Sequence, residues 1–311
     1  MRARANERAA AGRSADGQDG GVRLGIVTPV LTLLPKGHAR WEREAGWAEV
    51  VDIARAADRL GYHHLTCSEH VAVPTEVAAT RGARYFDPLA TFGYLAAVTE
   101  RIRLATFVVV LGYHHPLELA KRYGTLDVVS GGRLLLGVGV GSLEEEFDLL
   151  GAPFADRGER ADDALRAIRA SWGRAEPEYD GPHHRFGGVV VDPHGVREEV
   201  PIWVGGRTGR SLRRAIALGD GWAPFGLSLD EVRAVLDAHA GEARAEPFDV
   251  VLQPVPPLDP VGHPDEAAAA LDALAEAGAT IVSARVMHHS PAHCVEQLEA
   301  AMELPGVEAL R

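Results

Sequence analysis

The sequence predicts a single (β/α)8 barrel, and three observations support this. Short apolar segments alternate with amphipathic segments eight times from Val22 onward. The apolar segments are nearly continuous runs, which indicates strands buried on both faces in a parallel sheet covered by helices. The run Gly137–Gly141 resembles the start of a dinucleotide-binding loop, but Ser142 stands where its third glycine is required. The rival doubly wound sheet is therefore disfavoured.

The first half of the chain supplies four strand–helix units. The first strand is expected at Leu24–Pro29, and the helix after it has apolar residues at i, i+3, i+4 and i+7 spacing until Gly61 ends it. The next three strands are expected at His64–Ser68, Arg103–Leu111 and Leu134–Gly139, with helices opening at Asp87–Pro88, after Pro116 and at Gly158–Trp172.

The second half supplies four more units. One helix is expected after Ser228, which has capping-box spacing to Glu231. Another helix is expected at Ser211–Leu218. The last two are expected at Pro264 and Ser290–Pro291, because proline favours the first turn of a helix. The four strands are expected at Ile202–Gly205, Gly221–Phe225, Val250–Pro254 and Thr280–Val286.

Two segments fall outside this repeat. Tyr179–Val200, with Gly-Pro, Gly-Gly and Asp-Pro breakers around Val189–Val191, is interpreted as a hairpin inserted between the fourth and fifth strands, beside the barrel mouth. Residues 1–21 hold four arginines and no apolar run, so they lack the core of a secretory signal. We expect a disordered tail there and one barrel domain over residues 22–311.

Composition excludes several classes of function. The 311 residues carry 32 basic and 44 acidic side chains, a net charge of −12, which disfavours nucleic acid and anionic lipid as partners. The longest wholly apolar stretch, Phe107–Leu111, is far shorter than the ~20 residues of a membrane-spanning helix. Cys67 and Cys294 form no CxxC pair, so neither a disulfide framework nor a cysteine zinc site is expected. A cytoplasmic protein fits these features.

Catalytic residues of such a barrel lie at the C-terminal ends of its strands. Glu69 and His70 follow the second strand directly, which places a carboxylate and an imidazole at the mouth. The imidazole is suited to donate or accept a proton, or to donate a hydrogen bond to a cofactor ring. It is equally compatible with a histidine that satisfies a loop carbonyl.

The Gly205–Ser211 loop connects the fifth strand to a helix and is a candidate anion site. Free backbone N–H groups and the positive end of the helix favour a phosphate there. Arg207, Thr208 and Ser211 add further donors. The alternative is a tight turn whose glycines serve geometry alone and whose arginines are solvated.

Other chemistries are disfavoured. Four His-His pairs occur, at 63–64, 114–115, 183–184 and 288–289, but none has the i, i+4 spacing with which two imidazoles on one helix share a metal. Glu144, Glu145 and Glu146 are interpreted as a favourable acidic start to a helix. No G-x-S-x-G elbow surrounds Ser68 or Ser142, so a serine nucleophile is not expected.

Several motifs together resemble the luciferase-like monooxygenase superfamily, in particular its branch that uses the deazaflavin coenzyme F420. The resemblance covers residues 22 to about 290. Its motifs are His115-Pro116, Leu126–Gly141, Glu144–Phe147, Pro201–Gly206, Ser68–His70 and Leu218–Trp222.

The resemblance implies a coenzyme ring at the mouth and a phosphate over the fifth-strand loop. It also implies a bulge at Thr106–Phe107, with a non-proline cis peptide behind the ring, and catalytic roles for His70 and Glu69. Relatives are commonly dimers, so we expect a homodimer. The expected coenzyme-contacting residues are Thr106, Phe107, Gly139, Gly141, Ser142, Gly205, Gly206, Arg207, Thr208 and Ser211.

Three functions are compatible with this pattern. The leading one is hydride transfer between F420 and a small organic substrate, with His70 as proton partner. The second is an FMN-dependent monooxygenase fed by a separate reductase, and the third is a non-catalytic flavin-binding barrel. Some relatives that act on sugar phosphates have a glutamate where this chain has Ser142, so that proton donor and that substrate are not carried over.

The surroundings of the mouth suggest an apolar substrate and a basic track for the coenzyme. Residues expected to border the mouth are Leu111, Tyr113, Trp222 and Phe225. Residues expected to attract the charged oligoglutamate tail of F420 are Arg207, Arg210, Arg213 and Arg214.

Overall fold

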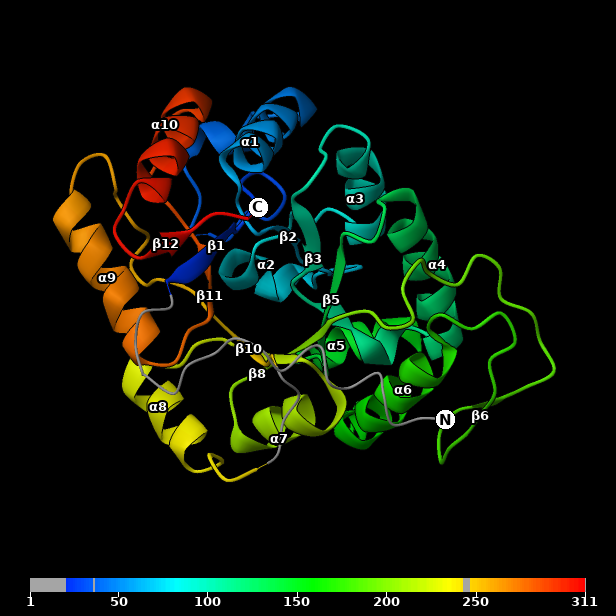
Figure 1. Ribbon diagram of the computed structural model, residues 1–311. Helices are drawn as coiled ribbons and strands as arrows, with labels where there is room; N and C mark the ends of the chain where they lie inside the picture. Colours follow the sequence, from blue (N-terminus) through cyan, green and yellow to red (C-terminus); the bar gives the residue numbers. More distant parts are fainter. Residues whose placement is uncertain (1–20, 36, 243–246, 311) are drawn as a thin grey trace, which may run out of the picture.

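Eight parallel strands form a closed ring surrounded by helices (Figure 1). The computed structural model describes residues 21–35, 37–242 and 247–310, so nearly all of the expected tail, residues 1–20, lies outside the described residues. β1 (Val22–Ile26) pairs with both β2 (His64–Cys67) and β11 (Ile281–Ala284), which closes the ring. The other strands follow in chain order: β3 (Arg103–Thr106), β5 (Leu134–Gly139), β8 (Ile202–Gly206), β9 (Gly221–Pro224) and β10 (Asp249–Leu252). The predicted barrel is confirmed.

Several helices begin and end where the capping signals predicted, whereas the helix expected at Ser211–Leu218 begins two residues earlier, at Gly209. Gly61, at φ 83°, ends α1 (Trp47–Leu60), because glycine adopts this left-handed conformation without strain. Asp87 and Ser228 accept hydrogen bonds from the amides of Ala90 and Glu231 at the start of their helices. The remaining helices of the outer ring are α3 (Pro88–Ala96), α4 (Pro116–Val129), α6 (Arg157–Ser171), α7 (Gly209–Leu218), α8 (Leu229–Asp237), α9 (Pro264–Glu276) and α10 (Pro291–Met302).

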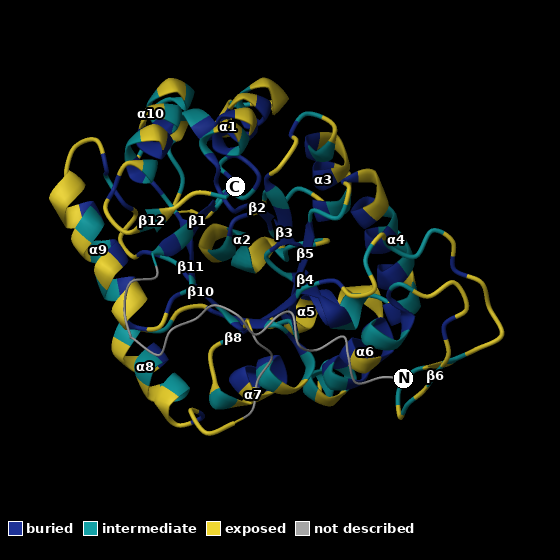
Figure 2. Ribbon diagram, viewed as in Figure 1, coloured by how far each residue is buried: buried dark blue, intermediate teal, exposed yellow. Residues whose placement is uncertain are grey.

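The buried residues form two clusters, one on each side of the barrel wall. The larger cluster lies between the strands and the helices, so the helices are buried on their inner faces and exposed outward (Figure 2). The smaller cluster fills the barrel, because alternate residues of a strand point inward. It consists of Ala105, Leu135, Trp203, Ala223, Val251 and Ile281.

A polar contact inside the barrel depends on one glycine. The imidazole of His64 occupies the space beside Gly25, and a Cβ there would lie 2.1 Å from the ring. His64 Nε2 forms a hydrogen bond of 2.7 Å with the Ser283 hydroxyl, across to β11. Gly25 therefore lets β1 pack between β2 and β11 at the point where the ring closes.

Several elements add to the predicted units. β4 (Val109–Val110) continues the third strand after a bulge and pairs with β5. β12 (Val307–Glu308) pairs with β1 outside the ring. The helices α2 (Thr75–Arg81) and α5 (Glu144–Leu150) lie in the loops after β2 and β5, and 3-10 turns occupy Arg40–Arg43 and Leu111–Tyr113.

The inserted hairpin between β5 and β8 is present but short. It consists of β6 (Tyr179–Asp180) and β7 (Arg185–Phe186), which are antiparallel around the turn that begins with Gly181-Pro182. Val189–Val191 lies beyond the hairpin, in an irregular segment.

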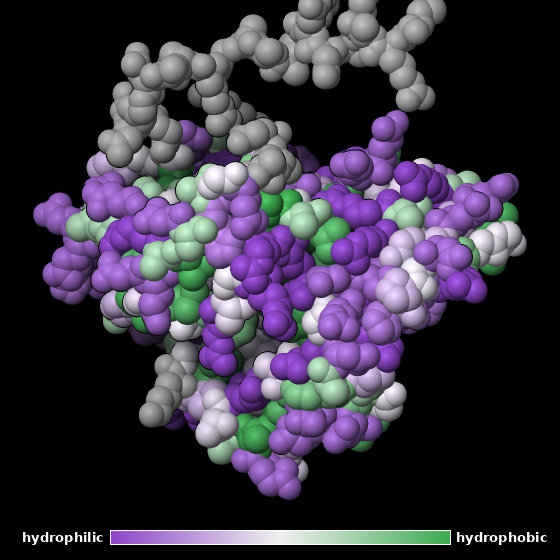
Figure 3. Space-filling view, turned by 90° about the horizontal axis from the view of Figure 1, so that it is seen from below, coloured by the Kyte–Doolittle hydropathy of each residue, from purple (hydrophilic) through white to green (hydrophobic). Residues whose placement is uncertain are grey.

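The face seen in Figure 3 is mostly hydrophilic, with hydrophobic residues scattered over it. Within the described residues, no helix combines the length and the apolarity that crossing a membrane requires.

Candidate functional site

The bulge in the third strand lies at the mouth and is held by the end of β2. The peptide bond Phe107–Val108 is cis, one residue later than the expected Thr106–Phe107. The Phe107 carbonyl accepts a hydrogen bond of 2.8 Å from the Ser68 hydroxyl, and the Val108 carbonyl accepts one of 3.3 Å from the Glu69 amide. The shift follows from the strand pairing, because Thr106 is still in register with Cys67 and the strand is interrupted only after it.

The bulge places the side chain of Val108 in the space left by two glycines. A Cβ on Gly139 would lie 2.7 Å from Val108 Cγ2, and one on Gly205 would lie 3.1 Å from Val108 Cγ1. These glycines, which lie on β5 and β8, were expected to contact the coenzyme. In the structure they leave room for the Val108 side chain. Val108, which the sequence did not single out, forms the surface at this part of the mouth.

His70 is oriented by a buried carboxylate from another loop. Its Nδ1 lies 2.6 Å from Oε2 of Glu146 on α5, and its ring packs edge-on against Tyr85, with centroids 4.5 Å apart. The His70 side chain is 17% exposed, whereas that of Glu146 is fully buried. Because the carboxylate accepts at Nδ1, Nε2 is left for a proton acceptor or donor at the mouth.

The Glu146 carboxylate accepts hydrogen bonds from three further groups. Besides His70, the Tyr113 hydroxyl donates to it at 2.7 Å, and the amides of Val71 and Ala72 donate at 2.6 and 3.1 Å. Burial alone would raise the pKa of Glu146, but the hydrogen bonds from His70, Tyr113 and Ala72 outweigh it and lower the pKa. The carboxylate therefore stays charged. The three glutamates lie in the first turn of α5, as expected, and Glu146 in addition anchors His70 and its loop.

Glu69 does not contact His70. Its Oε2 accepts the Val110 amide at 2.7 Å, and its Oε1 lies 2.8 Å from Nε2 of His114. Burial would lower the pKa of His114, but the hydrogen bond and charge of Glu69 raise it. Glu69 thus fixes the bulge and a second histidine, and its catalytic role stays a prediction.

The loop after β8 keeps free donors. The backbone amides of Arg207, Gly209 and Arg210 make no hydrogen bond within the described part of the chain, as expected at the start of a helix. Thr208 is exposed. The Ser211 hydroxyl, in contrast, is used internally, because it donates to the Thr208 carbonyl at 2.7 Å and accepts from Trp222 Nε1 at 3.1 Å.

Three of the four arginines of the predicted basic track are exposed. Arg207 and Arg210 are exposed at the loop. Arg213 is exposed as well and bonds to His239, and its Nη1 lies 3.9 Å from the position of a Cβ on Gly209. The track is shorter than predicted by Arg214, which is buried and forms an ion pair with Asp162.

The other expected coenzyme contacts differ in accessibility. Thr106 is fully buried, and its hydroxyl donates to the Gly137 carbonyl at 2.7 Å. Gly141 has φ 79° and lies against the Phe147 ring. Ser142 is exposed and accepts a hydrogen bond of 3.2 Å from Arg81 of α2. Of these three, only Ser142 presents its side chain at the surface.

The predicted apolar border is partly wrong. Leu111 and Trp222 are buried, because Leu111 packs into the main core and the Trp222 indole bonds to Ser211. Tyr113 contacts Glu146 as described above. Phe225 alone is exposed, at 54%.

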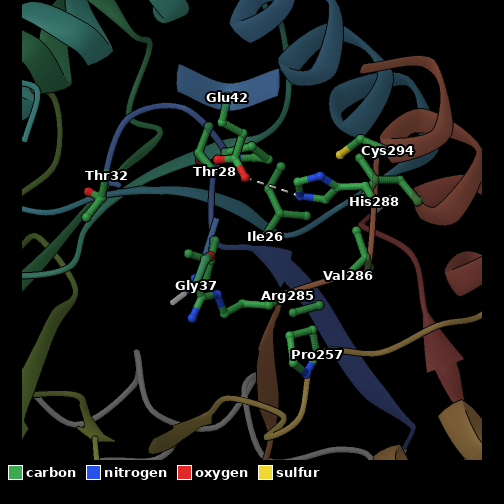
Figure 4. A pocket seen from close by; sticks show the side chains of 14 residues that line it. Ile26, Thr28, Thr32, Gly37, Glu42, Pro257, Arg285, Val286, His288 and Cys294 are labelled. Carbon is green, nitrogen blue, oxygen red and sulfur yellow. Dashed lines mark hydrogen bonds and ion pairs between the residues drawn. The ribbon is translucent and has the colours of Figure 1, made fainter. Parts of the chain in front are cut away.

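A small cavity of about 50 Å³ lies beside the ends of β1 and β11 (Figure 4). Glu42 and His288 face each other across it, with Oε1 and Nε2 3.9 Å apart. Glu42 also accepts the amides of Val30 at 2.8 Å and Ala39 at 2.6 Å. Val30 has φ 73°, which is strained for a β-branched residue. Glu42 therefore stabilises the loop after β1.

The comparison with known families decides the relationship that the motifs suggested. The model of the family described as luciferase-like monooxygenase matches residues 28–305. The chain belongs to the luciferase-like monooxygenase family. This match covers the ring strands from β2 to β11, the bulge, the loop after β8 and the His70 cluster, whereas β1 precedes it.

Curated members of the family include proteins of both coenzyme types. An uncharacterised protein of Mycobacterium tuberculosis is 33% identical over 221 residues, which are 66% of this chain and 78% of the relative. A second M. tuberculosis protein, whose assignment as a coenzyme F420-dependent oxidoreductase is itself provisional, is 31% identical over 156 residues, 46% of this chain and 44% of its own length. The oxygenase component of the flavin-dependent trigonelline monooxygenase of Acinetobacter baylyi is 28% identical over 174 residues, 55% of this chain and 46% of its own length.

Solved structures confirm the luciferase-like fold. Monooxygenase RslO1 of Streptomyces bottropensis has a TM-score of 0.75 at 24% identity, covering 91% of this chain and 98% of its own. The F420-dependent tetrahydromethanopterin reductase of Methanopyrus kandleri has a TM-score of 0.70 at 15% identity, with the same coverage. At these identities the likeness concerns the fold alone.

Sequence reasoning missed Glu146, although a signal for it was present. Leu143 and Phe147 are apolar at i, i+4 spacing, and both are buried. Glu146 lies three residues after Leu143, so it shares that buried face of α5. A charged residue on the buried face of a helix is rare without a partner. That pattern indicates a paired carboxylate.

Proposed function

We propose that this luciferase-like protein is an F420-dependent oxidoreductase, which transfers a hydride between the coenzyme and a small organic substrate at the C-terminal mouth. A deazaflavin supplies two-electron hydride transfer when bound, and the protein supplies orientation and a proton. The observation that carries the proposal is the exposed pair Arg207 and Arg210, whose amides, with that of Gly209, have no partner within the described residues.

This donor set fits a coenzyme phosphate. Three free amides at the start of the ten-residue helix α7 coincide with its positive end, which favours an anion. The Thr208 hydroxyl is available beside them, whereas Ser211 supports the loop from behind. Arg207, Gly209 and Arg210 would hold the phosphate, mainly through the backbone.

The local charge supports F420 over FMN. F420 continues beyond its phosphate into a tail with further negative charges, which a chain of net charge −12 repels unless basic residues offset it. Arg207 and Arg210 lie exposed at the loop, and among the described residues neither is in an ion pair. The partial identity to the M. tuberculosis protein assigned to F420 agrees with this choice.

His70 is the proposed proton partner. Its Nδ1 hydrogen bond to Glu146 fixes the ring and selects the tautomer with the proton on Nδ1, so that neutral His70 presents a basic Nε2. After accepting a proton, the imidazolium is stabilised by the charged Glu146 carboxylate. His70 can therefore hold or return a proton at Nε2 as the substrate is oxidised or reduced.

The second candidate is the FMN-dependent monooxygenase, which the 28% identity to the trigonelline monooxygenase component favours. Both coenzymes place one phosphate at the same donor set, so that set does not distinguish them. The distinction lies in the tail and therefore in its charge.

We also propose a homodimer. Tyr94 on α3 and Val129 at the end of α4 are 52% and 63% exposed, on the helices of the second and third units. Apolar exposure at neighbouring elements is typical of an interface. Light scattering on the purified chain is expected to give twice the mass of 33.2 kDa, and a monomer would exclude it.

A parallel fluorescence titration with F420 and FMN tests the coenzyme, at low and at moderate salt. F420 is expected to bind more tightly than FMN, and its binding is expected to weaken as salt rises, because salt screens exposed charges. Micromolar FMN binding without detectable F420 binding would favour the monooxygenase.

A further inference from the structure

A large groove opens beside the mouth, between α8 and α9. Its volume is about 1010 Å³, and it begins where β9, β10 and β11 end (compare α8 and α9 in Figure 1). Residues of both helices line it, among them Leu229 of α8 and Ala273 of α9. Ligand sites in proteins commonly enclose about 300–1,000 Å³.

The rim of the groove exposes apolar side chains. Phe225, Val255 and Met287 follow β9, β10 and β11, and they are 54%, 92% and 53% exposed. Three such residues from three different strands converge on one opening. Contiguous exposed apolar surface is typical of a binding site.

The walls are apolar as well, and the few charges at the groove are unsuited to an anion. Val232 of α8 and Ala270 and Leu274 of α9 line the interior. Asp259 and Glu266 are the acidic groups at the groove, and the whole chain carries −12. Electrostatic repulsion therefore disfavours a carboxylate or phosphate ligand here.

The groove is continuous with the candidate site. Pro224, the residue before Phe225, is in register with Gly206 at the start of the loop after β8. The Arg207 guanidinium lies 5.9 Å from the centre of the Phe225 ring. Phe225 thus borders the proposed phosphate loop on one side and the groove on the other.

We propose that this groove binds an uncharged, largely apolar small molecule, and that this molecule supplies the apolar part of the substrate. The identification with the substrate rests on the proposed function, whereas the binding itself does not. The main rival occupant is the charged tail of F420, which the apolar walls and the acidic rim disfavour.

The test is a titration of the full chain with Nile red, an uncharged apolar fluorophore, in the absence of coenzyme. Ala270→Trp fills the groove, and Ala269→Trp is its matched control, because Ala269 is an exposed neighbour on the same helix that does not line the groove. Ala270→Trp is expected to weaken Nile red binding at least about tenfold, or about 1.4 kcal/mol. Ala269→Trp is expected to leave it unchanged.

Val255→Ser provides a second variant that cannot disturb the core, because Val255 is 92% exposed. It is expected to weaken Nile red binding a few-fold with an unchanged thermal unfolding midpoint. Equal Nile red affinities in the wild type, Ala270→Trp and Val255→Ser would overturn the proposal.

F420 titrations of the same variants separate the two proposals. The groove proposal expects equal F420 affinity in wild type, Ala270→Trp and Ala269→Trp. A loss of F420 affinity confined to Ala270→Trp would assign the groove to the coenzyme tail and overturn the proposal. If the wild type binds no F420 but the variants change Nile red binding as expected, the proposed groove ligand is supported and the proposed coenzyme is wrong.

Discussion

At the scale of single residues, two buried carboxylates each direct one histidine at the mouth. Glu146 holds Nδ1 of His70, and Glu69 holds Nε2 of His114. The two pairs differ in purpose, because Glu69 also binds the amide of Val110 in the bulge, whereas Glu146 binds the loop that carries His70. His70 is thus free to act while His114 is part of the framework.

His70→Ala is expected to lower turnover about 10²–10⁴-fold with any substrate that supports it, because positioned acid–base groups typically contribute that much. Coenzyme affinity, measured by the fluorescence titration, is expected to change little. Turnover within a few-fold of wild type with intact coenzyme binding would remove His70 from the mechanism.

Glu146→Gln tests the positioning role separately. The amide keeps the volume of the carboxylate but loses its charge and one acceptor atom, so the hold on the His70 ring weakens. Turnover is expected to fall, by less than in His70→Ala, while coenzyme affinity in the fluorescence titration stays unchanged. The matched control is Glu145→Gln on the exposed side of the same helix, which is expected to leave turnover unchanged. Equal turnover in Glu146→Gln and wild type would contradict the role assigned to Glu146.

The pair of His114 and Glu69 predicts a pH dependence of stability. The pKa of His114 is raised in the fold, so its protonated form stabilises the protein below its ordinary pKa of about 6.5. This contribution is lost as the pH rises through the raised value. The free energy of unfolding, measured by urea titration, is expected to fall over that interval in the wild type and to fall less in His114→Gln. Equal slopes in both proteins would be inconsistent with the pair.

At the scale of elements, the bulge after β3 depends on small residues in its neighbours. Gly139 and Gly205 leave the space that Val108 fills, and Gly137 lies against the Thr106 carbonyl. In sequence, the glycines of 137–141 resemble the start of a dinucleotide-binding loop. Their actual role is to let β5 and β8 lie against the bulge.

Gly139→Ala is expected to destabilise the protein by about 1–3 kcal/mol, because the added Cβ overlaps Val108. It is also expected to weaken coenzyme binding by displacing Val108. The control is Gly93→Ala in the middle of α3, where a Cβ meets nothing within 4 Å. This change is expected to stabilise by about 0.5–1 kcal/mol. Thermal unfolding measures both, and a Gly139→Ala protein as stable as wild type would exclude the packing role.

The ring elements were predictable because their signals are local. Continuous apolar runs gave the eight strands, and Asp87, Ser228 and Gly61 marked helix ends that the structure confirms. β12 was not predictable, since its two residues gain their partner only when the ring has closed. The cis peptide was misplaced by one residue, because the strand pairing, not the local sequence, sets where the bulge begins.

The candidate site was less predictable than the fold. His70 and the loop after β8 follow directly from their places after strands. The partner of His70, however, lies 76 residues further along the chain. The packing of two loops determines that Glu146, and not Glu69, bonds to His70. Local residue spacing does not reveal this packing.

At the scale of the whole molecule, the negative net charge and the local basic residues have opposite effects on the coenzyme. Arg207 and Arg210 provide exposed positive charge at the loop, with exposed Arg213 beside them, whereas Arg214 is paired with Asp162. A charge substitution far from the loop changes the net charge as much as one at the loop does. Comparing the two substitutions therefore separates the effect of net charge from the effect of local charge.

Arg210→Glu is expected to weaken F420 binding about three- to tenfold at low salt and less at moderate salt, because exposed charge interactions are small and screened. Arg59→Glu changes the net charge equally at a 63% exposed site on α1, and is expected to have almost no effect. If the two variants weaken F420 binding to the same degree, the basic pair has no local role.

The most direct test of the central claim, that a deazaflavin binds at the C-terminal mouth beside His70, is a crystal structure of the chain with F420. The account predicts the coenzyme phosphate within hydrogen-bond distance of the amides of Arg207, Gly209 and Arg210. It predicts the ring against Val108, with the reacting face toward Nε2 of His70. A phosphate bound away from the loop after β8, or a ring with no access to His70, would contradict it.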